Sequence, residues 1–212
     1  MPRFSHSFPL PLIAIVTVLL GFSPFLSACS DDSATVPLYA TVLPEPLPLP
    51  EFSLRDQDDR PFTRDNLRGR SNLLFFGFTH CPDICPATLQ QLATARKQIA
   101  EKHAARDGED LPEIVLISVD PERDTSAKLR QYVDHFGDGV SAVTGSMEEI
   151  KKLTSALGIF FEKVPAGAGG YTVSHSTAVL VIDANAELTA LFSSPHKIES
   201  FVHDIPLLTA SR

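Results

Sequence analysis

The sequence predicts an α/β domain in which a central mixed sheet carries helices on both faces. Two observations lead to this class. Apolar runs typical of buried strands alternate along the chain with stretches that have the helical period of 3.6 residues, which is the pattern of layered α/β domains. Near the C-terminus, two apolar segments are separated by only three residues, as in an antiparallel hairpin, so the sheet is expected to be mixed.

The strands are expected where apolar residues cluster over short stretches. Residues 72–78 and 113–119 are nearly continuous apolar runs, so both are expected to be strands that are covered on both faces. Shorter strands are expected at 52–54, 61–63 and 159–161, and a pair at 176–183 and 187–192 encloses the turn at 184–186.

Four amphipathic stretches are expected to be helices. The first follows Cys85 and has one stripe that faces inward, formed by Leu89, Leu92, Arg96 and Ile99. The second is expected at 125–136 and the third between Met147 and Leu157. A closing helix begins near Ile198, and Pro206 is expected to end it. The glycine-rich residues 165–170 are expected to form a flexible loop.

Residues 1–28 are expected to be a lipoprotein signal peptide. One charged residue, Arg3, precedes an apolar run at 10–20, which has signal-peptide length and is short for a membrane span. Small residues precede Cys29, as in the bacterial lipobox, where the cysteine is lipidated and becomes the mature N-terminus. The alternative is an uncleaved anchor helix at 8–28, which its prolines disfavour. Both interpretations place the rest of the chain outside the cytoplasm, on the periplasmic side, anchored to a membrane.

Residues 29–50 are expected to be the lipidated cysteine and a tether, and residues 51–212 a single domain. The prolines between residues 37 and 50 favour an extended polyproline conformation with about 3.1 Å per residue. Such a tether would reach roughly 40 Å and would hold the domain clear of the lipid headgroups.

Composition excludes several classes of protein. With 43% hydrophobic and 21% charged residues, the chain is globular rather than disordered. A formal net charge of -8 argues against a nucleic-acid partner, which requires a basic face. Three cysteines are too few for a disulfide-scaffolded mini-protein.

Cys81 and Cys85 carry the strongest chemical signal. They follow the expected strand at 72–78, and Pro82 suits the first position of a helix. A strand that leads into two cysteines at the start of a helix narrows the class to a thioredoxin-like fold. The helix dipole and the unpaired backbone N–H groups at this place are expected to lower the pKa of the Cys81 thiol.

The spacing of the two cysteines allows two kinds of chemistry. In a helical turn their Cβ atoms would lie roughly 5–6 Å apart, which permits a disulfide after adjustment or two sulfurs on one metal ion. Three intervening residues, instead of the two of the ordinary redox motif, favour the metal, and soft sulfur ligands select Cu(I) over Zn(II). A structural disulfide remains an alternative outside the cytoplasm.

Two thiolates are an incomplete ligand set, so a histidine is expected as the third ligand. We favour His175, in the loop that faces the dithiol turn in thioredoxin-like folds. Taken alone, this residue would more readily be a hydrogen-bonded loop histidine; the family resemblance described below reverses that preference. His80 is expected to modulate Cys81 or to take no part. The other candidates are expected to be solvated: His103, His135, His196 and His203.

Residues 119–125 follow the second buried strand and open the next helix. Asp124 is expected to cap this helix, and Arg123 to pair with Glu122 or Asp120. In the functional alternative, Asp120 lies at the same end of the sheet as the cysteines and shapes the outer shell of the metal or a docking surface.

These stretches together resemble the Sco/SenC family of copper-binding cytochrome c oxidase assembly proteins. The matching residues are 77–86, 119–125 and 173–177, in the family's order, and the resemblance covers about residues 50–208. It implies a thioredoxin fold and a copper ion bound by Cys81, Cys85 and His175. It also implies a metallochaperone that delivers copper to the dinuclear site of cytochrome c oxidase subunit II, or a reductant of that site's cysteines.

The chain departs from the family at Ser174, where many members have Asp, so the support of the imidazole is an open question. The anchor also looks like lipid rather than a spanning helix. Two enzymatic alternatives remain. In a thiol–disulfide oxidoreductase, Cys81 would attack and Cys85 would resolve. A peroxidase is disfavoured, because Phe78 stands where the thioredoxin-fold peroxidases have Thr.

Overall fold

The structure, a computed structural model, describes Met1 and residues 36–103 and 111–210. The expected signal peptide, its Cys29 and the alternative anchor helix at 8–28 lie outside the described residues. Within the described ranges, no helix combines the length and the hydropathy that a membrane crossing requires.

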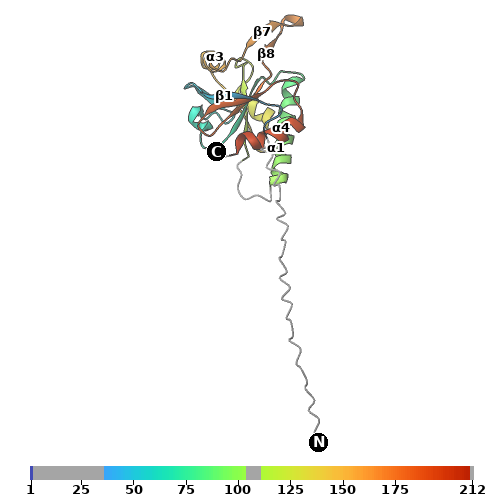
Figure 1. The fold of residues 1–212 in the computed structure, drawn as a ribbon. Coiled ribbons are helices and arrows are strands. Elements are labelled where there is room, and N and C mark those ends of the chain that lie inside the picture. The colour runs from blue at the N-terminus through green and yellow to red at the C-terminus, as the bar shows by residue number, and fades with distance from the viewer. Residues whose placement is uncertain (2–35, 104–110, 211–212) are drawn as a thin grey trace. The chain divides into compact units, whose positions relative to one another are not determined.

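A mixed sheet of eight strands forms the centre of the described domain, in the order β1-β10-β9-β4-β5-β6-β2-β3 (Figure 1). The strands β4, β5 and β6 are parallel, whereas β9 runs antiparallel to both β4 and β10. The bounds are β1 Thr41–Pro48, β2 Ser53–Asp56, β3 Pro61–Thr63, β4 Asn72–Gly77, β5 Glu113–Ser118, β6 Val140–Thr144, β9 Val179–Ile182 and β10 Glu187–Phe192. The mixed sheet predicted from the sequence is confirmed, although the prediction assigned no residue range to β6.

Every residue of β4 is buried, so both faces of the central strand are covered. The helices are α1 Ile84–His103, α2 Ser126–Val133, α3 Met147–Ala156 and α4 Ile198–Thr209. The helices α1 and α4 pack against each other (Figure 1), while α2 packs against β6. The inward stripe predicted for the first helix is confirmed, because Leu89, Leu92 and Ile99 are buried.

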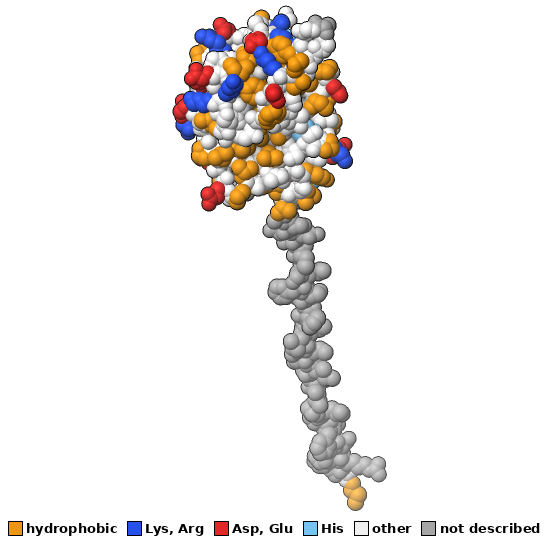
Figure 2. Space-filling view, turned by 90° about the horizontal axis from the view of Figure 1, so that it is seen from above, with side chains coloured by type: hydrophobic (Ala, Val, Ile, Leu, Met, Phe, Trp, Pro, Cys, Tyr) orange, Lys and Arg blue, Asp and Glu red, His pale blue; other side chains and the backbone are white. Residues whose placement is uncertain are grey.

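Charged side chains of both signs are mixed on the face shown in Figure 2, with hydrophobic side chains exposed between them.

The structure also has two short 3-10 helices, at Arg64–Leu67 and Gly167–Gly169.

A separate two-stranded hairpin projects from the body of the domain (Figure 1). It consists of β7 Phe161–Pro165 and β8 Tyr171–His175. The prediction of a strand at 159–161 is therefore wrong in its position, because β7 begins at Phe161, where the predicted strand ends. Residues 165–170, expected as a loop, form the turn of the hairpin. Val173 is the only buried residue of β8, so this strand has little of the apolar signal that marks a strand in a sequence.

The proline-rich segment expected as a tether is in part a strand of the sheet. Thr41 pairs with Leu191 and Pro48 with Glu187, and the register is irregular between Val42 and Leu47. Proline lacks an N–H group, so an irregular edge strand is a position in a sheet that tolerates it. The prediction of a polyproline tether is thus wrong for residues 41–48, which form β1. The folded domain begins earlier in the sequence than the predicted residue 51.

Asp204 of α4 fixes the beginning of the domain. Its fully buried carboxylate accepts hydrogen bonds from the backbone N–H groups of Leu38, Tyr39 and Ala40, at 3.0, 2.7 and 2.7 Å. Burial opposes ionisation, but these N–H groups and the His203 ring lower the pKa of Asp204 below its usual value. The helix that carries it includes Pro206 and ends at Thr209, so the predicted stop at Pro206 is wrong.

Candidate metal centre

The two cysteines lie where β4 leads into α1. The helix begins at Ile84, two residues later than predicted, so Cys81 precedes it and Cys85 lies in its first turn. The backbone N–H of Cys85 donates to the Sγ atom of Cys81 over 3.3 Å. Both residues are free thiols; Cys85 is fully buried, whereas Cys81 is partly exposed.

Gly77, the last residue of β4, allows the Cys85 sulfur to lie close to the sheet. A Cβ atom at this position would be 3.0 Å from Cys85 Sγ and 3.2 Å from Leu116 Cδ1. The glycine therefore leaves room for the close approach of the thiol.

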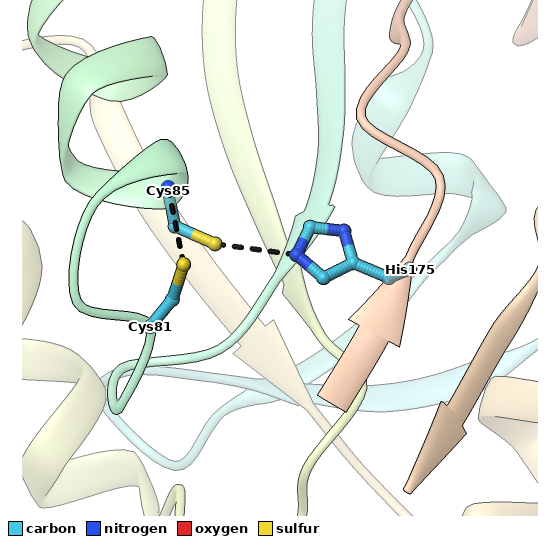
Figure 3. Close-up of side chains that lie close together, drawn as sticks. All are labelled: Cys81, Cys85 and His175. Carbon is cyan, nitrogen blue, oxygen red and sulfur yellow. Dashed lines mark hydrogen bonds between the residues drawn. The ribbon is translucent and has the colours of Figure 1, made fainter. Parts of the chain in front are cut away.

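His175 comes from the other side, at the end of β8, and points toward the two thiols (Figure 3). Its Nε2 atom lies 3.4 Å from Cys85 Sγ. Its Nδ1 atom lies 2.9 Å from the carbonyl oxygen of Ser176, to which it can only donate, so the lone pair is on Nε2. The support expected from position 174 is thus supplied by a backbone carbonyl. The ring packs edge-on against Phe75 and Phe78.

The two thiols have opposite acidities. Interaction with the Cys85 side chain, then with His175 and with the N–H groups of Cys85 and Asp83, lowers the pKa of Cys81 from 9.0 to about 4, although burial opposes the shift. Interaction with Cys81 and then burial raise the pKa of Cys85 above its ordinary value. The centre therefore presents one thiolate at its surface and one thiol beneath it.

Asp124 stabilises the segment that carries Cys81 and Cys85, here called the cysteine segment. Its fully buried carboxylate accepts hydrogen bonds from the Thr79 backbone N–H at 2.9 Å, the Thr79 hydroxyl at 2.6 Å and the Ser118 hydroxyl at 2.7 Å. The role predicted for Asp124 is wrong, because Thr125 caps α2 by accepting from the N–H of Lys128. The parallel strands β4 and β5 end at the same edge of the sheet, which brings these groups together.

Asp120 and Arg123, in the loop that follows β5, form an ion pair, as the sequence predicted. Both residues contact the hairpin of β7 and β8 that carries His175, here called the histidine hairpin. Arg123 Nη1 donates to the carbonyl oxygen of Tyr171, the first residue of β8, over 3.0 Å. The Tyr171 hydroxyl donates to Asp120 over 2.7 Å. The role of Tyr171 was missed, because β8 itself was not expected.

Among the histidines whose side chains the structure describes, His175 alone joins the two cysteines. His80 is exposed and lies near Asp120 and Asp124, whose oxygens already accept the hydrogen bonds described above. His135 is exposed, as expected. His196 is half-buried and its ring nitrogen lies 2.7 Å from the Thr177 carbonyl oxygen, so its expected solvation is wrong; burial lowers its pKa.

The donor set fits a soft metal ion. The ligand atoms of Cys81, Cys85 and His175 all lie within 4.8 Å of one another. Two ligands of one ion are at most about 4.6 Å apart when the metal–sulfur distance is about 2.3 Å, so little adjustment is needed. Two sulfurs and one imidazole nitrogen form a three-coordinate set of the kind that suits Cu(I).

Comparison with known proteins gives the family. The model of the SCO1/SenC family matches residues 42–209. A SCO2-like protein of Rickettsia felis is 36% identical over 157 residues, which are 72% of this chain and 74% of the relative. The crystal structure of Arabidopsis thaliana ScoI with copper bound is similar with a TM-score of 0.70 and 33% identity, over 76% of this chain and 96% of that one.

A SCO1/SenC family lipoprotein from Bacillus anthracis has a similar structure, with a TM-score of 0.64 and 27% identity over 78% of this chain and 98% of that one. The solved structures confirm the thioredoxin-like fold that the sequence predicted. The matched region includes the strand-to-helix turn with both cysteines and the hairpin that ends at His175. The chain therefore belongs to the SCO1/SenC family.

Proposed function

We propose that this protein is a copper metallochaperone that binds Cu(I) through Cys81, Cys85 and His175 and passes it to another protein. The observation that supports this most directly is the convergence of two sulfurs and one imidazole nitrogen with a free lone pair. A three-ligand set satisfies Cu(I) and leaves one side open, so an incoming ligand can bind before a resident one leaves.

The surroundings of the centre suit transfer by ligand exchange. Cys81 is a partly exposed thiolate, so a recipient's sulfur can approach the ion on this side while Cys85 and His175 still hold it. Two exposed apolar residues belong to the segments that meet at the centre. Ile84, with 45% of its surface exposed, directly precedes Cys85. The backbone N–H of Phe160, a residue that is 58% exposed, donates to the hydroxyl of Ser176, the residue after His175, over 3.0 Å. An apolar recipient surface could contact both residues.

For the recipient and the location, the family resemblance supports the dinuclear copper site of cytochrome c oxidase subunit II, on the extracytoplasmic side of a membrane. We propose that Cys29 carries the lipid anchor, since its lipobox agrees with the lipoprotein relative from Bacillus anthracis. The domain begins before Thr41, so the tether between Cys29 and the folded part is much shorter than the 29–50 expected.

Copper binding by the reduced protein tests the proposal. Wild type is expected to retain about one Cu(I) per chain after gel filtration, and Cys85→Ser and His175→Ala are expected to lose tight binding, because two ligands hold the ion much less well than three. Less than about half an equivalent in wild type, or binding that Cys85→Ser leaves unchanged, would contradict it.

A second function is favoured by the low pKa of Cys81, whose thiolate is partly exposed. As a thiol–disulfide oxidoreductase, Cys81 would attack a disulfide of the recipient and form a mixed disulfide, with a recipient thiolate leaving. Cys85 would then lose its proton and displace the second recipient thiolate, so the recipient is reduced and a Cys81–Cys85 disulfide forms. His175→Ala separates the two functions, because it removes a copper ligand and should leave dithiol exchange largely intact.

A further inference from the structure

Arg123 makes several contacts with the hairpin that carries His175. The guanidinium of Arg123 stacks on the Tyr171 ring, 3.8 Å from its centroid. The same group donates to the Tyr171 carbonyl oxygen over 3.0 Å and to the Asp120 carboxylate over 2.5 Å. One side chain thus joins the loop after β5 to the first residue of β8.

Further contacts follow the same path. The Tyr171 hydroxyl donates to Asp120, and Lys163 of β7 pairs with Glu122 over 2.5 Å and lies 4.7 Å from the centroid of the Tyr171 ring. The hydrogen bond to Asp120 and the ion pair with Glu122 join the loop at 120–124 to the hairpin, and the contact between Lys163 and the Tyr171 ring joins its two strands. Val173 and Phe161 pack on the core near the His175 end of the hairpin, whereas the residues of β7 after Phe161 are exposed. A hairpin of two strands is marginally stable by itself, so these contacts decide where its far end lies.

We propose that Arg123 is a positioning residue for the third metal ligand. It holds Tyr171 at one end of β8, so that His175 at the other end keeps its Nε2 atom 3.4 Å from Cys85 Sγ. When this contact loosens, the imidazole withdraws while both thiols stay in place. The inference rests on the proposed function in that it takes copper as the metal. In this case the hairpin is the part of the domain that moves when the copper ion is released.

The test compares Arg123→Gln with Arg96→Gln. Arg96 is a matched control, because it is similarly shielded, with 20% exposure against 24%, and donates to the carbonyl oxygens of Pro112 and Asp138. Cu(I) affinity is measured by competition with a chelator. Arg123→Gln is expected to weaken binding by about 10-fold to 100-fold, the usual effect of a residue that orients a metal ligand, and Arg96→Gln to leave it unchanged.

A double-mutant cycle separates positioning from general damage. In a His175→Ala background, Arg123→Gln is expected to cause no further loss of affinity, since it acts through the imidazole. An equal loss with and without His175, or an equal effect of Arg96→Gln, would overturn the proposal.

Hydrogen exchange on the metal-free protein provides a readout without copper. Arg123→Gln is expected to speed the exchange of the β8 amides and to leave those of β4 and β5 unchanged. If wild type binds no copper, the proposed function fails, yet this measurement still decides whether Arg123 holds the hairpin. Unchanged exchange in β8 would overturn the positioning role.

Discussion

The cysteine segment and the histidine hairpin meet at one centre, but they are attached to the domain in different ways. The cysteine segment rests on Asp124, which is fully buried and accepts three hydrogen bonds. The histidine hairpin is held by Arg123, whose side chain is 24% exposed and pairs with the buried Asp120. Both attachments start from the loop that follows β5. The comparison teaches that the two thiols are held by the core of the domain, whereas the imidazole is carried by a projecting hairpin.

This difference has a consequence for a metal carrier. Buried hydrogen bonds that cannot be replaced by water are costly to break, while contacts at the surface exchange with water at low cost. In the proposed function, two ligands would thus be fixed in advance and the third could leave. Such a carrier would bind its ion tightly with three ligands and release it through a state with two.

The largest expected effect concerns the two thiols of the fixed segment. Because the pKa of Cys81 is lowered to about 4 and that of Cys85 is raised, brief alkylation at any pH between about 4 and 9.0 is expected to label Cys81 and spare Cys85. Mass spectrometry of the peptides checks this in the metal-free protein. Equal labelling of both thiols would show that the asymmetry is absent.

The same shift predicts how stability depends on pH. The folded chain holds the Cys81 proton less tightly than the unfolded chain, so this group stabilises the metal-free protein increasingly as pH rises from about 4 toward 9.0. The contribution is lost as pH falls through about 4. Denaturant titrations of wild type and Cys81→Ser at several pH values isolate it, since the variant lacks this group.

Asp124→Asn gives the next largest effect. It leaves a buried donor against the hydroxyls of Thr79 or Ser118, and an unsatisfied buried group costs about 1–3 kcal/mol, so the free energy of unfolding is expected to fall by about that amount. Copper affinity is expected to fall as well, because the cysteine segment loses its support. Asp204→Asn is the matched control. Asp204 is equally buried but contacts none of the ligand segments, so this variant should lose stability and keep its affinity.

Gly77→Ala is expected to have a smaller effect on the fixed segment. The added Cβ would meet Cys85 Sγ at 3.0 Å, and overpacking of this kind costs about 1–3 kcal/mol, here at the low end because a thiol can shift slightly. Gly167→Ala, where a Cβ atom meets nothing within 4 Å, is expected to unfold at the wild-type denaturant concentration. A Gly77→Ala variant as stable as Gly167→Ala would mean that the thiol is not closely packed.

The cysteine segment could be predicted from the sequence better than the histidine hairpin. The continuous apolar run of β4 and the cysteines after it identify both the fold and two ligands, because burial on both faces leaves a strong local pattern. The hairpin leaves almost none, since Val173 is its one buried residue in β8. His175 was therefore assigned through the family resemblance, and the role of Tyr171, at the other end of the same strand, was missed.

The errors at the beginning and the end of the domain have a related cause. Prolines predict an extended tether and a helix stop, but tertiary contacts decide otherwise. The edge strand β1 tolerates prolines where its register is irregular, and Pro206 lies in the last turn of α4. Asp204, which holds residues 38–40 through three N–H groups, is separated from them by most of the chain and cannot be paired with them from local pattern.

X-ray absorption spectroscopy of the Cu(I)-loaded protein tests the convergence of fixed thiols and a movable imidazole most directly. The wild-type spectrum is expected to fit two sulfur neighbours and one nitrogen neighbour, and Arg123→Gln is expected to lose part of the nitrogen contribution while both sulfurs remain. A wild-type spectrum with sulfur neighbours alone, unchanged by His175→Ala, would contradict this account.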